Sequence, residues 1–155
     1  METKNENVIN GLNNLIEINN DRVEGYKKAS EELEDTELKP LFYEMARKSR
    51  EFGGILTGEV RTLGGTPAEG TKTAGKFYRV WMDVKAAFAG HDKKAILETC
   101  EYGEDAAQAE YDDVLKSEDL NTNASVKSLV LEQKASLRED HDKIKSLRDA
   151  ARASN

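Results

Sequence analysis

The sequence contains few cysteines, prolines and aromatic residues, and each of these shortages limits the kind of protein it can be. Its single cysteine, Cys100, excludes an internal disulfide framework and fits a reducing compartment. Aromatic residues make up 6% of the chain, and runs of β-branched residues are few, so a sheet protein is not expected. Only two prolines occur in 155 residues, which leaves long helices uninterrupted.

Long apolar runs are also missing. No stretch approaches the roughly 18 consecutive apolar residues that mark a membrane-spanning helix, and the first seven residues lack the apolar segment of a signal peptide. The 30 acidic and 23 basic side chains leave a net charge of −7. Such a surface repels a phosphate backbone, so nucleic-acid binding is not expected. These features predict a cytoplasmic protein, with membrane contact disfavoured.

What the chain does contain is helical periodicity. Inward residues recur at alternating spacings of four and three in four long segments, and a short amphipathic segment lies between the second and third. The connection that carries this short segment, at about 66–91, is long enough to run the length of a bundle. The sequence therefore predicts one all-α domain over 1–155: an up-down four-helix bundle with a short extra helix in the long crossover between helices two and three.

Several residues are placed to end or to cap these helices. Gly64 can adopt the left-handed conformation that closes the second helix, and Pro67 prevents its continuation. Asp92 and Asn123 are expected to cap the third and fourth long helices. Two adjacent glycines inside the second helix, at 53–54, predict that another helix approaches closely there.

Three motifs connect the chain with a known group of proteins. Leu-Gly-Gly-Thr-Pro closes the second helix at 63–67, Trp-Met-Asp-Val-Lys-Ala-Ala occupies 81–87, and Glu-x-Cys-Glu-x-Gly-Glu-Asp-Ala occupies 98–106. Together they resemble a bacterial family of ferritin-like bundles of unknown function, and the resemblance extends from about residue 9 to residue 148. It implies a ferritin-like fold but no established activity. Relatives in that superfamily suggest an association with stress.

A ferritin-like di-iron site draws a glutamate from each of two helices and a Glu-x-x-His motif from each of the other two. This chain has two histidines, His91 and His141. The residues three positions before them are Phe88 and Arg138, so the sequence contains no Glu-x-x-His motif. A di-iron enzyme is therefore not expected.

The positions that would hold ligands are mostly occupied by other residues. Counting back from the end of the second helix, the resemblance places its Glu-x-x-His motif on Ser49 and Phe52. In the first helix the inward position is Asn19. In the last helix His141 remains, while Arg138 stands where the glutamate would be.

Two interpretations of these polar residues are open. The preferred one is a buried network that fixes helix register and needs no cofactor. Its members are Asn19, Ser49, Glu104, Arg138 and His141. Arg138 either pairs with Glu104 or Glu110 or lies on the solvated face. In the alternative, His141 and Glu104 hold a single divalent metal ion.

The function expected from these features is non-enzymatic. The preferred hypothesis is a bundle that acts by protein contacts or self-association, and the competing one is a metal-binding bundle with a degenerate or mononuclear site in its core. The short helix presents an apolar face that either covers one end of the bundle or contacts a second copy or another protein. That face consists of Phe77, Trp81, Val84 and Phe88.

Overall fold

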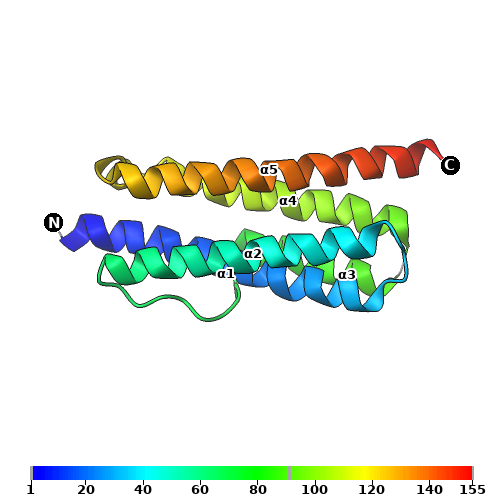
Figure 1. The fold of residues 1–155 in the computed structure, drawn as a ribbon, viewed down its shortest axis with the longest axis horizontal. Coiled ribbons are helices and arrows are strands. Elements are labelled where there is room, and N and C mark those ends of the chain that lie inside the picture. Colours follow the sequence, from blue (N-terminus) through cyan, green and yellow to red (C-terminus); the bar gives the residue numbers. More distant parts are fainter. Residues whose placement is uncertain (1, 91, 155) are drawn as a thin grey trace.

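Five α-helices account for most of the chain (Figure 1). The computed structural model describes the backbone of residues 2–90 and 92–154, and the side chains of these residues except 2–4, 32, 76–77 and 88–90. No residue in these ranges lies in a strand, so the prediction of an all-α protein is confirmed. The elements are α1 (Glu2–Glu32), α2 (Leu38–Thr62), α3 (Gly75–Gly90), α4 (Lys93–Leu115), the short 3₁₀ helix η1 (Glu118–Thr122) and α5 (Ala124–Ala153).

The long helices form two hairpins. In Figure 1, α1 packs against α2 along its length, and α4 packs against α5 in the same way. An extended segment leaves the end of α2 and leads to α3, which packs on α4 and touches α1. Because this connection and α3 together cross the molecule, α2 and α4 run in the same direction. The short helix expected between the second and third long helices is therefore present.

Local signals end and begin the helices as expected. The α2 helix closes in a Schellman motif, in which Gly65 N–H donates to the carbonyl of Val60 at 2.9 Å and Gly64 adopts a φ of 86°. The side chain of Asp92 accepts from a backbone N–H of α4, and the side chain of Asn123 does the same for α5.

One continuous apolar core joins the helices. Among the described side chains it contains 27 buried hydrophobic residues, and it draws on every long helix as well as on α3. No described helix is both long enough and apolar enough to cross a membrane.

The apolar face of α3 packs into this core. Trp81 and Val84 are 1% and 0% exposed, and Trp81 donates its indole N–H to the backbone carbonyl of Asp21 in α1 at 2.8 Å. The side chains of Phe77 and Phe88 lie outside the described residues. Trp81 and Val84 therefore cover the core of their own chain, which is the first of the two interpretations of this face. Contact of this helix with a partner stays a prediction.

Candidate functional site

A fully buried arginine stands at the centre of the bundle. Arg22 of α1 binds Glu104 of α4 through two hydrogen bonds, from Nε to Oε2 at 3.1 Å and from Nη2 to Oε1 at 2.8 Å. Nη2 also donates to Asp140 Oδ2 of α5 at 3.1 Å, and Nη1 donates to the hydroxyl of Ser49 in α2. One guanidinium group thus links all four long helices.

Two further side chains complete the hydrogen bonding around this arginine. The Tyr26 hydroxyl donates to Glu104 Oε2 at 2.9 Å, and Lys48 Nζ donates to Asp140 Oδ1 at 2.9 Å. The core ion cluster consists of four charged residues: Arg22, Lys48, Glu104 and Asp140. The two positive charges of the cluster balance the two negative charges of its carboxylates. Their mutual attraction offsets the free-energy cost of removing these charges from water.

Burial and neighbouring charges together raise the pKa values of three groups in this region, Arg22, Tyr26 and Cys100. Burial alone lowers the pKa of Arg22, but the interactions with Glu104, Tyr26 and Asp140 together outweigh that effect and raise the pKa above its ordinary value. Burial, reinforced by the charge of Glu104, raises the pKa of Tyr26 and of Cys100 well above their usual range. Cys100 is therefore a protonated thiol that packs in the core and is not poised as a nucleophile.

The core ion cluster contains only part of the network expected from the sequence. Ser49 and Glu104 lie in or against it, but its arginine is Arg22 and not Arg138. The side chain of Arg138 is 59% exposed and pairs with Asp142 one turn further along α5 at 3.1 Å. Of the two placements that the sequence left open for Arg138, the structure shows the solvated one, so Arg138 is not part of the buried network; α5 turns that position toward solvent.

The sequence did contain a signal for Arg22. This residue falls on the inward stripe of α1, where a guanidinium group is costly unless carboxylates pair with it. Asp140 gave no comparable signal, since it is one of several acidic residues close together in α5.

Asn19 belongs to a second buried polar layer. Its Nδ2 donates to the Tyr111 hydroxyl at 2.8 Å and to the carbonyl of Leu15 at 2.9 Å. The Tyr111 hydroxyl donates to Gln133 Oε1 at 2.9 Å, and Gln133 Nε2 donates to the carbonyl of Phe52 at 3.4 Å. Burial raises the pKa of Tyr111 to about 12. This layer also joins all four long helices, and Phe52 contributes through its backbone carbonyl.

His141 of α5 lies at the contact between α4 and α5. Its Nε2 is 2.5 Å from Asp105 Oδ1, and its Nδ1 is 3.0 Å from Asp142 Oδ1. One ligand atom from each of Glu101, Asp105 and His141 lies within 4.8 Å of the other two. The partners of the His141 ring are thus Asp105 and Asp142, whereas Glu104 is held in the core ion cluster. The metal pair of His141 and Glu104 stays a prediction. The other histidine, His91, lies outside the described residues.

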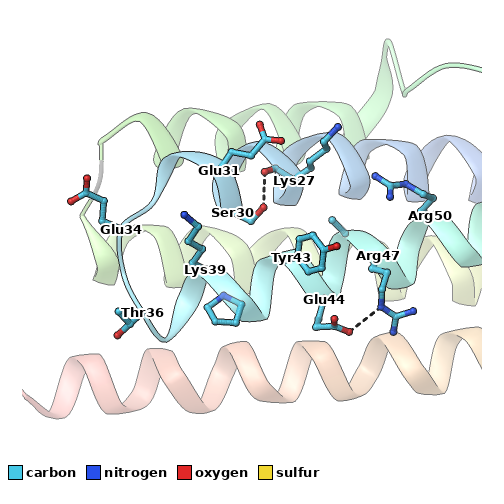
Figure 2. Close-up of a pocket in the computed structure, with 12 residues that line it drawn as sticks. Lys27, Ser30, Glu31, Glu34, Thr36, Lys39, Tyr43, Glu44, Arg47 and Arg50 are labelled. Carbon is cyan, nitrogen blue, oxygen red and sulfur yellow. Dashed lines mark hydrogen bonds and ion pairs between the residues drawn. The ribbon is translucent and has the colours of Figure 1, made fainter.

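A groove opens on the outer face of the α1–α2 hairpin (Figure 2). Its volume is about 1150 Å³, and the Tyr43 side chain that lines it is 61% exposed. A second hollow of about 620 Å³ shares Arg50 with it and continues past Gly53 and Gly54. Together they form the α1–α2 groove. The charged side chains of its larger part are Lys27, Lys39, Arg47, Arg50, Glu31, Glu34 and Glu44.

Comparison with known proteins identifies a family match over most of the chain. The sequence model of a family described as a domain of unknown function (DUF2383) matches residues 7–117. The matched segment includes Arg22 and Glu104 and ends before α5, so it contains neither Asp140 nor His141. No curated protein matches the chain.

Proposed function

The chain belongs to the DUF2383 family, whose function is unassigned, and we propose that it is a non-enzymatic, ferritin-like bundle that self-associates through the α1–α2 groove. The observation that carries this proposal is the groove with its exposed Tyr43. Tyrosine is enriched at the centres of protein interfaces, where its ring contributes apolar area and its hydroxyl a hydrogen bond.

The order of the elements supports the ferritin-like part of the proposal. Two antiparallel hairpins are joined by a connection that crosses the length of the molecule, and α2 and α4 consequently run in parallel. A single long crossover is the connectivity that distinguishes ferritin-like bundles from bundles with only short loops.

The residues at the bundle centre do not fit the di-metal group that this fold class implies. Such a centre needs several free carboxylates and imidazoles. Here Arg22 and Tyr26 already occupy both oxygens of Glu104, and the guanidinium charge would repel a divalent pair. The mononuclear core alternative has little support as well, because His141 faces Asp105 instead of Glu104. This is the basis for proposing a non-enzymatic role.

The charges along the groove favour a second copy as its occupant. Two chains of net charge −7 repel each other over most of their surface. The larger part of the groove differs, because four basic and three acidic side chains line it. In a two-fold symmetric contact the cations of one copy can face the carboxylates of the other.

Gly54, which lines the groove, allows the two copies to approach closely. Apart from the backbone of its own helix, no described heavy atom lies within 4 Å of a Cβ added at Gly54, so this position faces open space. We therefore expect a partner helix to contact the backbone of α2 at Gly54. Of the two adjacent glycines, Gly53 is packed against α1, where an added Cβ would lie 3.8 Å from Asn20 Oδ1 and 4.0 Å from Asn19 Cβ. The space beside Gly54 is left for the partner.

Sedimentation equilibrium on purified protein tests the proposal. We expect a dimer for the wild type and a monomer for Tyr43→Glu, because the substitution removes the aromatic ring from the centre of the contact and requires a charge to be desolvated in its place. Tyr102→Glu is the matched control, since Tyr102 lies on α4 and is 68% exposed. It should remain a dimer, and circular dichroism should show unchanged helix content in both variants. A monomeric wild type at the highest soluble concentration would overturn the proposal.

A further inference from the structure

The contact between α4 and α5 gathers one imidazole and two carboxylates outside both the core ion cluster and the α1–α2 groove. Glu101 and Asp105 are four residues apart on α4, which places their carboxylates on the same face of the helix. His141 approaches from α5 and is 6% exposed. We propose that these three residues bind a divalent transition-metal ion of the zinc type between the two helices.

The spacing of the three groups is close to that of a metal site. Their ligand atoms lie within 4.8 Å of one another, whereas ligand atoms around a tetrahedral zinc ion are roughly 3.4 Å apart, as follows from bond lengths of about 2.1 Å. The Asp105 side chain is 61% exposed and can rotate to close this difference. Its exposure also leaves room for water to complete the coordination.

The imidazole is already oriented for such a role. Asp142 Oδ1 lies 3.0 Å from His141 Nδ1, and Arg138 Nε donates to the same Asp142 oxygen at 3.1 Å. When Nδ1–H donates to Asp142, the lone pair of Nε2 faces the two carboxylates of α4. A carboxylate behind a ligating histidine is a recurrent arrangement at zinc sites. Arg138 and Asp142 are therefore positioning residues for this site.

A competing arginine would control access of the ion to Glu101. Arg148 Nη1 bonds to Glu101 Oε2, and an ion bound at this oxygen would displace it. Arg148 Nη2 also pairs with Asp149 at 2.8 Å, so the guanidinium keeps a carboxylate partner after leaving Glu101. Removal of the arginine charge should therefore strengthen binding.

The donor set indicates which ions should bind. One imidazole nitrogen and two carboxylate oxygens suit zinc, and the usual affinity order of divalent ions places manganese below it. Calcium prefers six to eight oxygen ligands, so this site should discriminate against it. An ion held by both helices would cross-link α4 to α5 and raise the stability of the folded chain.

Isothermal titration calorimetry of chelator-treated protein with Zn²⁺, Mn²⁺ and Ca²⁺ tests the site. We expect one Zn²⁺ per chain, weaker binding of Mn²⁺, no Ca²⁺ binding, and a higher melting temperature with Zn²⁺. His141→Ala and Asp105→Asn should each weaken Zn²⁺ binding by more than about tenfold. Asp113→Asn, which changes an exposed carboxylate elsewhere on α4, should leave it unchanged.

Arg148→Gln provides the sharper test. It should tighten Zn²⁺ binding by about two- to fivefold, because that range corresponds to loss of a competing ion pair near the surface. Asp105 is exposed, so Asp105→Asn should fold even if His141→Ala does not. Equal Zn²⁺ affinity in the wild type, His141→Ala and Asp105→Asn would overturn the proposal, as would the absence of saturable binding. The same titration on Tyr43→Glu separates this result from self-association.

Discussion

Among single residues, Arg22 has the most unusual environment. Its side chain is completely buried, and it contacts Glu104, Asp140 and Ser49 on three other helices. A buried ion pair contributes little net stability compared with apolar residues of the same volume, but the removal of one partner leaves the other charge unpaired in the core. The stability of the bundle therefore depends strongly on this one guanidinium group.

The prediction at this scale is that Arg22→Met lowers the free energy of unfolding by about 3–5 kcal/mol, the usual cost of breaking a buried ion pair. Methionine roughly keeps the side-chain volume, so the loss reports mainly on the charge. Arg138→Met removes an exposed ion pair with Asp142 and should cost less than about 1 kcal/mol. Urea denaturation followed by circular dichroism measures both values. Similar losses in the two variants would show that the pairing of Arg22 contributes little.

At the scale of elements, the start of α2 depends on an aspartate two residues before Glu37. The Oδ1 atom of Asp35 accepts from the backbone N–H of Leu38 and of Glu37, each at 2.9 Å. These bonds favour the ionised carboxylate, and the bond from Leu38 contributes most to lowering the pKa of Asp35 below 3.8. The side chain thus satisfies two N–H groups that would otherwise lack partners at the helix start.

The resulting prediction concerns pH as well as stability. Asp35→Ala should lower the free energy of unfolding by about 1 kcal/mol at neutral pH, as loss of a cap does. The pKa of Asp35 is lower in the folded state, so the carboxylate stabilises the protein above its unfolded pKa. That contribution is lost as the pH falls through the folded pKa. Thermal melts across this range should show the wild type and Asp35→Ala converging at acid pH. Asp35→Asn should keep most of the cap without the pH dependence.

For the whole molecule, Trp81 of α3 contributes to the junction between the two hairpins. Its ring packs against Gly25 of α1 on one side and Gly103 of α4 on the other. It also meets Tyr26 edge to face, with ring centroids 5.4 Å apart. A Cβ at Gly103 would come within 2.8 Å of a Val84 methyl group and 2.9 Å of the Trp81 ring. The close approach of α3 to α4 therefore requires a glycine at 103.

We predict that Gly103→Ala and Gly58→Ala have opposite effects on stability. Both glycines lie within helices, so each alanine gains up to about 1 kcal/mol in helix propensity. Gly58 faces open space, and its variant should melt at a higher temperature than the wild type. Overpacking against a rigid indole costs about 1–3 kcal/mol, so Gly103→Ala should melt lower. Differential scanning calorimetry compares them, and equal stability of the two variants would show that the Trp81 contact can relax.

Local features of the sequence determined the helices and their ends. The spacing of apolar residues, the left-handed Gly64 and the caps at Asp92 and Asn123 each depend on residues a few positions apart. An all-α chain with a short helix in its long connection followed from these features. The physical reason is that a helix and its caps depend on hydrogen bonds and side-chain spacing within a few turns.

Only the tertiary structure decided which polar residues meet. Arg22 is 82 positions from Glu104 and 118 from Asp140, so no local pattern joins them. Arg138 and Asp140 differ by two positions, which is a rotation of roughly 200° around the helix axis. This rotation places Arg138 on the solvent face of α5 and Asp140 on its inner face. The packing of four helices sets that rotation, and with it the choice of Arg22 over Arg138 at the centre of the bundle.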